Sequence, residues 1–267
     1  MKIGSIGAGN MGGAIAVAIS KAIGADDVQY VSDADAQKAS ALAAEIGAQV
    51  SDNMTLAREC DVLVLGVKPQ VMPLVAEQIA STVRERGEKI LVISMAAGIS
   101  LDDYAKMLGE QAPVIRIMPN TPVSVGEGMI LWCAGACVSD EQIGTFTSVM
   151  SRAGELDMIP EGLIDAAGCI SGCGPAFVSM FIEALADGGV RCGVPRDKAM
   201  KYAIRTLIGT ATLASETKIH PGALKDAVCS PGGTTIEGVI ALENGSFRGD
   251  VAGAVIAAYE KTIKLTK

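Results

Sequence analysis

One stretch near the start of the chain, Ile6-Gly7-Ala8-Gly9-Asn10-Met11-Gly12, constrains the fold more than any other. It joins a short apolar segment, residues 1–6, to an apolar helix, which is the setting that a Gly-x-Gly-x-x-Gly turn requires. The first glycine permits the tight turn, the second lets backbone N–H groups approach a pyrophosphate, and the third lets the helix pack closely on the strand. The turn therefore predicts a dinucleotide whose phosphates face the positive end of the helix dipole.

Asp33 supports the same interpretation. It follows a second predicted strand, Val28–Val31, and comes 21 positions after Gly12, close to the spacing of about 20 expected of a ribose-binding carboxylate. The alternative is an ordinary strand-to-helix turn without a nucleotide. The agreement of turn, helix and carboxylate disfavours that alternative.

The composition bounds the class of protein. A chain of 267 residues makes one large or two ordinary domains. Its 49% hydrophobic but only 3% aromatic residues suit closely packed helices and buried parallel strands. The net charge of −8, with no cluster of lysine and arginine, argues against a nucleic-acid partner. The longest apolar run, residues 90–99, is too short to span a bilayer, so we expect no membrane association.

The seven cysteines indicate a reducing compartment, because they are odd in number and none forms a Cys-x-x-Cys pair. With a single histidine they make a poor zinc set, so we expect small buried hydrophobes and no metal. Met1-Lys2 leads directly into a strand, which predicts no signal peptide and a cytoplasmic location.

Predicted strands alternate with helices from the start of the chain to about residue 160. We expect strands at 1–6, 28–31, 49–50, 61–67, 89–94, 114–118, 128–133 and 155–159, with helices at 36–46, 54–59, 71–86, 101–108 and 140–152. This alternation predicts a Rossmann-type, doubly wound α/β sheet over residues 1–160.

Ligands of such sheets lie beyond the carboxyl ends of the strands. Val67, Lys68 and Pro69 follow one buried strand, and the small-residue stretch Met95, Ala96 and Ala97 follows the next. Both stretches are therefore placed to line a cofactor site. A solvated loop lysine is an equally good interpretation of Lys68.

After about residue 160 the pattern becomes helical. Helices are predicted at 174–191, 196–218, 221–228, 234–243 and 248–265, which gives an all-α domain over residues 161–267. The helix from Pro175 to Val190 is apolar on nearly every side and must be covered all round. We therefore predict an obligate homodimer in which the helical domains of two copies interlock.

A second motif, Ser230-Pro231-Gly232-Gly233-Thr234-Thr235, ends one predicted helix and begins the next. The junction offers N–H groups, a hydroxyl and a favourable dipole to a substrate carboxylate. Thr235 lies within the first turn and can direct its hydroxyl to a polar atom nearby. Helix capping by Ser230 and Thr234 explains the same residues equally well.

A nucleotide domain followed by a helical domain suggests a dehydrogenase. Reduction of a ketone needs a positioned acid, usually histidine or lysine. The single histidine, His220, precedes Pro221 and is typical of a helix-start turn, and the helix from Cys173 to Val190 contains no lysine. A protonated imine needs less help, because it already carries its charge.

The chain resembles the pyrroline-5-carboxylate reductase family over its whole length. The matching stretches are Ile6-Gly7-Ala8-Gly9-Asn10-Met11, Val67-Lys68-Pro69, Ser94 with Ala96-Ala97-Gly98, Arg116-Ile117-Met118-Pro119-Asn120-Thr121-Pro122, Ser171-Gly172-Cys173-Gly174-Pro175-Ala176 and Val228-Cys229-Ser230-Pro231-Gly232-Gly233-Thr234-Thr235. The last is the family's signature. The resemblance implies reduction of 1-pyrroline-5-carboxylate to L-proline by NAD(P)H, the last step of proline biosynthesis.

Residue roles follow from the same resemblance. It implies that Ser230 and the backbone of Gly232, Gly233 and Thr234 hold the substrate carboxylate, and that Thr235, the catalytic residue, bonds the ring nitrogen. With Ser32 and Asp33 added from the second strand, cofactor contacts are expected from Ile6, Gly7, Ala8, Gly9, Asn10, Met11, Ser32, Asp33, Asn53, Val67, Lys68, Pro69, Met95, Ala96 and Ala97. Family members form interlocked dimers, often assembled into decamers. Cys173 and Phe177 stand where serine and tyrosine are common in the family, which bears on substrate geometry rather than on the reaction.

The choice of dinucleotide stays open at this stage. Asp33 would bond a free ribose 2′-hydroxyl and repel a 2′-phosphate, whereas Ser32 and Lys38 would receive a phosphate. Family resemblance places NADPH ahead of NADH.

Two rival functions remain. A β-hydroxyacid dehydrogenase shares the two-domain plan but would be expected to carry a catalytic lysine on the inter-domain helix. A dinucleotide-sensing or assembly protein would keep the fold without turnover, and the intact Ser230–Thr235 motif argues against it.

Overall fold

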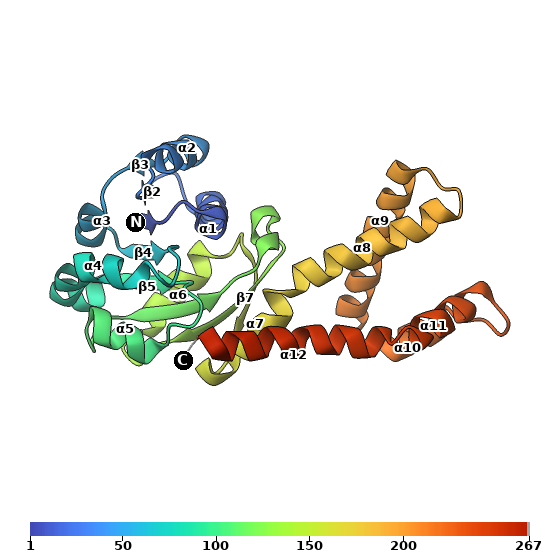
Figure 1. The fold of residues 1–267 in the computed structure, drawn as a ribbon. Helices are drawn as coiled ribbons and strands as arrows, with labels where there is room; N and C mark the ends of the chain where they lie inside the picture. Colours follow the sequence, from blue (N-terminus) through green and yellow to red (C-terminus); the bar gives the residue numbers. More distant parts are fainter. Residues whose placement is uncertain (266–267) are drawn as a thin grey trace. The chain divides into compact units, whose positions relative to one another are not determined.

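The computed structural model describes residues 1–265 and contains two compact units (Figure 1). The first comprises Met1–Cys173 together with the stretch that begins at Tyr259, and the second comprises Gly174–Ala258. The predicted architecture, a Rossmann-type sheet domain followed by an all-α domain, is confirmed. The predicted boundary at residue 160 stays a prediction.

A single eight-stranded sheet organises the first unit. Its strands are β1 (Lys2–Ile6), β2 (Val28–Ser32), β3 (Gln49–Val50), β4 (Val62–Leu65), β5 (Leu91–Ser94), β6 (Val114–Met118), β7 (Gly128–Ala134) and β8 (Gly154–Met158). They lie in the order β3-β2-β1-β4-β5-β6-β7-β8. The order reverses between β1 and β4, and a crevice forms at such a switch point in open α/β sheets.

Helices cover both faces of this sheet (Figure 1). They are α1 (Asn10–Ala22), α2 (Ala36–Ile46), α3 (Asn53–Glu59), α4 (Met72–Arg86), α5 (Leu101–Leu108), α6 (Asp140–Val149) and α7 (Glu161–Ser171), with short 3₁₀ turns η1 (Gly87–Lys89) and η2 (Thr121–Val125). Successive residues of β4 enter opposite cores, because side chains alternate along a strand. Leu63 packs with α3, α4 and α5, whereas Val64 packs with α1 and α6.

The structure contains two features that the sequence did not predict. The helix α7 occupies residues that the prediction left between the last strand and the first helix of the second domain; Ile164 on this helix is buried against Leu131 and Cys133 of β7. The strand β7 runs antiparallel to β6, so the sheet is not wholly parallel. The 3₁₀ turn η2 lies between these two strands and lets the chain return directly.

The second unit contains α8 (Gly174–Arg191), α9 (Arg196–Thr217), α10 (Pro221–Ala227), α11 (Thr234–Asn244) and most of α12 (Phe247–Leu265). Its buried core consists of Ala186, Ala199 and Ala203, where α8 packs on α9. Many large apolar side chains of this unit are exposed in the single chain, among them Met180 at 70% and Tyr202 at 57%. The span Glu161–Arg191, which begins in α7 of the first unit and contains an 18-residue window with a mean hydropathy of 1.5, is long and apolar enough to cross a bilayer by length and composition alone.

Candidate active site

A cleft of about 600 Å³ lies at the switch point of the sheet. It is lined from the end of β1 by Ile6, Gly7 and Gly9, and from the end of β4 by Gly66, Val67 and Lys68. The remaining sides come from the end of β2 and from α3 and α4. The cleft therefore lies where ligands bind in open α/β sheets.

Close backbone packing explains the first and third glycines of the turn. Gly7 has φ +105, a left-handed value that disfavours other residues, and its N–H donates to the Ser32 carbonyl oxygen at 2.7 Å. A Cβ on Gly12 would lie 2.3 Å from the Gly7 carbonyl oxygen and 3.3 Å from the Cα of Gly66. These contacts hold α1 against the loops that follow β1 and β4.

Gly9 has a different reason to be glycine. A Cβ at this position would meet no heavy atom within 4 Å, so the packing of the described chain does not require glycine here. Gly9 is the N-cap residue of α1, has no side-chain cap, and lines the cleft. Open space beside the unpaired N–H groups of a helix start fits a pyrophosphate.

Asp33 is fixed in place at the end of β2. One carboxylate oxygen accepts the backbone N–H of Ala8 at 2.6 Å, and the other accepts the N–H of Asp35 at 2.8 Å. The side chain of Asp33 also lines the cleft beside Lys38. Lys38 in turn forms an exposed ion pair with Asp35 at 3.6 Å. This corner of the cleft thus presents a carboxylate held in one orientation.

Ser32 and Asn53, which both line the cleft, form a short polar chain. The Ser32 hydroxyl donates to Asn53 Oδ1 at 2.7 Å, and Asn53 Nδ2 donates to Gln78 Oε1 at 2.7 Å. The chain joins β2 to α3 and α4. Both atoms of the Asn53 amide are therefore held by a hydrogen bond at the edge of the cleft.

The other predicted cofactor residues are spread around this cleft. Ala8 and Asn10 line a neighbouring hollow of about 410 Å³, which shares Gly9 and Lys38 with the first. Met11 and Pro69 line neither cleft. Met95 donates its N–H to the Leu65 carbonyl oxygen at 3.3 Å, Ala96 is buried and Ala97 is exposed. The Met95–Ala97 stretch thus follows β5, the strand next to β4, without lining the cleft.

The Ser230–Thr235 motif lies in the helical unit, where it joins α10 to α11. Gly233 is the N-cap of α11 and no side chain caps it, so capping by Ser230 or Thr234 does not account for these residues. The Gly233 N–H donates to the Ser230 carbonyl oxygen at 3.0 Å. Ser230, Thr234 and Thr235 are all exposed in the single chain. His220 caps α10 through Nδ1, which accepts the Gly222 N–H at 3.1 Å.

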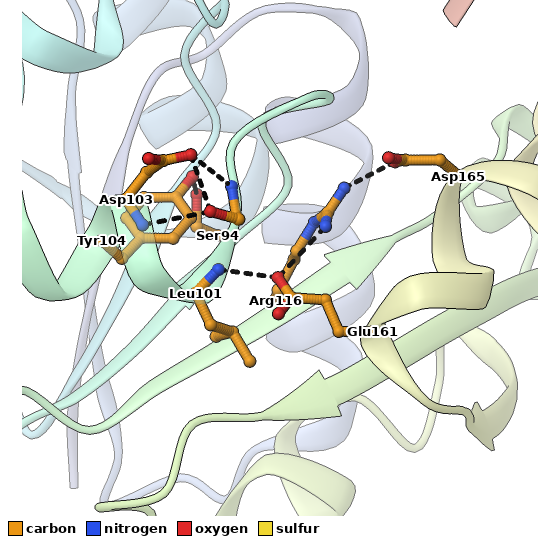
Figure 2. Close-up of polar contacts among 8 residues, drawn as sticks. Ser94, Leu101, Asp103, Tyr104, Arg116, Glu161 and Asp165 are labelled. Carbon is orange, nitrogen blue, oxygen red and sulfur yellow. Dashed lines mark hydrogen bonds and ion pairs between the residues drawn. The ribbon is translucent and has the colours of Figure 1, made fainter. Parts of the chain in front are cut away.

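A buried polar cluster that the sequence did not predict involves Ser94 of β5 and Arg116 of β6 (Figure 2). The Tyr104 hydroxyl is paired with Ser94 Oγ at 2.5 Å, and burial raises the pKa of Tyr104 to about 12. In the next strand Arg116, opposite Ser94 in register, forms ion pairs with Glu161 and Asp165 of α7. A charged residue inside the apolar segment Val114–Met118 was the one available signal.

Residues 1–265 contain no group of three or more His, Cys, Asp or Glu side chains arranged to hold a metal ion.

Two family models match the chain. Residues 161–265 match the pyrroline-5-carboxylate reductase dimerisation family, and residues 2–98 match the family described as NADP oxidoreductase coenzyme F420-dependent. More remote structures share the fold alone, for example 3-hydroxyisobutyrate dehydrogenase of Mycobacterium tuberculosis, with a TM-score of 0.54 and 15% identity over 88% of this chain and 71% of that one.

Similarity to named relatives extends over the whole chain. The Escherichia coli pyrroline-5-carboxylate reductase is 40% identical over 270 residues, covering 100% of this chain and 98% of its own, and the Synechocystis enzyme is 45% identical over 81% and 79%. A solved structure of the Plasmodium falciparum pyrroline carboxylate reductase with NADP bound has a TM-score of 0.89 and 31% identity, covering 100% of this chain and 98% of that one. The chain belongs to the pyrroline-5-carboxylate reductase family.

Proposed function

We propose that the cleft between the ends of β1 and β4 holds the dinucleotide with which this chain reduces 1-pyrroline-5-carboxylate. The protein is an NAD(P)H-dependent pyrroline-5-carboxylate reductase that forms L-proline in the last step of proline biosynthesis. The observation that carries the placement of the cofactor is the open space at Gly9, at the N-terminus of α1. The bound dinucleotide supplies the hydride, and the chain's own residues orient the two reactants.

The cofactor's parts are assigned by chemistry. The N–H groups of Gly9, Asn10 and Met11, beside the backbone of Ala8, hold the pyrophosphate at the helix start. Residues at the ends of β2 and α3 hold the adenosine ribose, and residues after β4 and β5 line the nicotinamide side. The ribose residues are Ser32, Asp33 and Asn53. The residues on the nicotinamide side are Val67, Lys68, Pro69, Met95, Ala96 and Ala97.

The substrate is held by the Ser230–Thr235 motif. The Ser230 hydroxyl and the N–H of Thr234, the first residue of α11, bind the carboxylate beside the backbone of Gly233, and Gly232 permits the turn with φ +68. Thr235, one position further along α11, bonds the ring nitrogen and keeps the imine oriented for the hydride. The uncapped start of α11 supports this assignment, because its N–H groups are not satisfied by a capping side chain.

NADPH is the proposed reductant, and NADH is accepted as well. Lys38 provides a cation to a 2′-phosphate, and Ser32 provides a hydroxyl once it turns from Asn53, whereas the fixed Asp33 carboxylate bonds a free 2′-hydroxyl. Both kinds of partner line the same corner of the cleft.

The working form is a homodimer in the cytoplasm, with a decamer as a further assembly. The apolar side chains on α8 to α12 that are exposed in the single chain, such as Met180, Ile208 and Ile256, form a surface that a second copy covers. The same covering accounts for the apolar span Glu161–Arg191 without a membrane. We propose no nucleic-acid partner, because the net charge is −8. Sedimentation without detergent tests the proposed dimer. A monodisperse dimer, or a multiple of it, supports the proposal, and a monomer or a requirement for detergent contradicts it.

The reaction is tested by the loss of reduced-nicotinamide absorbance when purified protein meets 1-pyrroline-5-carboxylate, with NADPH and NADH in parallel. Rapid oxidation that forms L-proline is expected. A matched assay in the oxidative direction uses 3-hydroxyisobutyrate, a β-hydroxyacid. Folded protein that binds dinucleotide but oxidises none with the imine would contradict the proposal, and activity on the hydroxy acid alone would favour the dehydrogenase alternative.

A further inference from the structure

Arg116 is a buried cation in the middle of the sheet. Its neighbours along β6 are apolar and buried, and its own side chain is only 4% exposed. A buried guanidinium is costly unless it is paired and hydrogen-bonded. Both partners of Arg116 come from one helix, α7 (Figure 2).

The partners lie one turn apart on α7. Arg116 Nη1 donates to Glu161 Oε1 at 3.2 Å, and Nη2 donates to Asp165 Oδ1 at 2.6 Å. The same Glu161 Oε1 also accepts the backbone N–H of Leu101, the first residue of α5, at 2.7 Å. The Arg116 guanidinium therefore connects the first half of α7 to β6 through two ion pairs, and Glu161 connects α7 to α5 through a hydrogen bond.

A second contact holds the far end of α7. Asn120, which is also buried, donates through Nδ2 to the carbonyl oxygen of Ser171 at 2.9 Å and accepts the N–H of Met129 through Oδ1 at 2.8 Å. Ser171 is the last residue of α7, and α8 begins at Gly174. The helix is thus fixed to the sheet at both ends.

We propose that Arg116 is a positioning residue for hydride transfer, acting through α7. The chain passes from the sheet unit to the unit that carries Ser230 and Thr235 directly after this helix, so the Arg116 contacts fix the last helix of the sheet unit before that passage. The inference rests on the proposed function, which divides cofactor and substrate residues between the two units. Arg116 does not line the dinucleotide cleft, so its loss is expected to affect the alignment of reactants rather than cofactor binding.

The test compares Arg116→Met with a matched variant, Arg86→Met, in the full chain. Arg86 also binds main-chain groups of the sheet unit, donating to the carbonyl oxygens of Ala57, Cys60 and Lys89, and none of these three acceptors belongs to α7. For Arg116→Met we expect kcat to fall by about 10- to 100-fold, because a displacement of about 1 Å suffices for such a loss. The affinity for NADPH, measured by fluorescence titration, is expected to stay unchanged. Arg86→Met is expected to lower thermal stability while kcat stays at the wild-type value.

Two further measurements separate positioning from mere stability. Amide hydrogen exchange should accelerate in α7 of Arg116→Met and stay unchanged in β1 and β4. Arg116→Lys, which keeps the charge but not the two-pronged geometry, should recover part of kcat. If Arg116→Met does not fold, Asp165→Asn, which keeps the pair with Glu161, should lower kcat in the same direction by less.

The proposal is overturned if folded Arg116→Met, or Asp165→Asn in its place, keeps the wild-type kcat. It is also overturned if NADPH affinity falls as much as kcat, or if Arg86→Met lowers kcat equally. Wild-type protein is assayed alongside. An inactive wild type would count against the proposed function, whereas an active wild type with an equally active variant would count against the inference alone.

Discussion

The backbone N–H of Ala8 donates a hydrogen bond of 2.6 Å to the Asp33 carboxylate, which joins the glycine-rich turn to the end of β2. The second oxygen of the same carboxylate accepts the Asp35 N–H, so two backbone hydrogen bonds hold this cleft-lining side chain in one orientation. In the proposed binding mode, this negative charge faces the group that the adenosine ribose carries at its 2′ position. Discrimination between NADH and NADPH is therefore expected to depend on this one side chain.

We predict that Asp33→Asn raises the ratio of kcat/KM for NADPH to that for NADH. Two like charges about 4 Å apart repel by about 1 to 4 kcal/mol near a protein surface, so the ratio should rise by at least about fivefold. Steady-state kinetics with both dinucleotides measure it. Asp26→Asn, an equal change of charge at an exposed position outside the cleft, is the control and should leave the ratio alone. An unchanged ratio in Asp33→Asn would show that the carboxylate does not face the 2′ position.

Gly12→Ala should lose stability, whereas Gly9→Ala should lose affinity for the dinucleotide. Alanine at Gly12 would place a Cβ 2.3 Å from the Gly7 carbonyl oxygen, and we expect a loss of stability of about 1–3 kcal/mol or more from overpacking. Alanine at Gly9 would meet only open space, so stability should be kept while dinucleotide affinity falls. Denaturant unfolding and dinucleotide titration of both variants provide the comparison. If folded Gly9→Ala binds the dinucleotide with wild-type affinity, the pyrophosphate does not lie beside Gly9.

The features predicted well from sequence are those with a local physical cause. The glycine turn is recognisable because only glycine adopts φ +105 at Gly7 and only a missing Cβ allows the approach of Gly12. The buried strand at 62–65 is recognisable because a parallel strand covered on both faces is apolar throughout.

The features that were missed depend on distant partners. Nothing near Arg116 in the sequence identifies Glu161 and Asp165, which lie 45 and 49 positions away. The helix α7 carries Gly162 and Gly168, which weaken a helical pattern, and Gly168 is accommodated because it packs against the Met118 side chain. The antiparallel direction of β7 leaves no mark in its own residues, since it follows from how the chain turns at η2.

Alkaline pH should destabilise the fold through two buried thiols. Burial raises the pKa of Cys60 and of Cys133 from 9.0 to about 11. The unfolded chain loses these protons first, so it binds fewer protons than the folded chain between about pH 9 and about pH 11, and the free energy of unfolding falls as pH rises through that window. The loss is up to about 3 kcal/mol per thiol.

Denaturant unfolding across that window measures the effect of the two thiols. The variant Cys60→Ala with Cys133→Ala should show a shallower decline than the wild type, whereas Cys192→Ala, which removes an exposed thiol, should decline as the wild type does. Other groups also titrate at high pH, including Tyr104 near 12, so the difference between variants is the quantity that tests the thiols. Equal slopes in all three proteins would contradict the prediction.

Thr235→Ala should separate turnover from cofactor binding. Thr235 is the second residue of α11 and lies beside the N–H groups assigned to the substrate carboxylate. If its hydroxyl supports the ring nitrogen in the transition state as an oxyanion-hole donor supports its oxygen, the loss is about 2.7 to 4 kcal/mol, or about 10²- to 10³-fold in kcat. A smaller loss is expected if the charged imine needs little support. Single-turnover kinetics give the rate of the chemical step, and titration gives dinucleotide affinity, which should stay the same.

Thr234→Ala is the matched control, because the role assigned to Thr234 uses its backbone N–H and survives the substitution. Equal losses of turnover and dinucleotide binding in Thr235→Ala, or equal losses of turnover in the two variants, would make Thr235 a structural residue of α11.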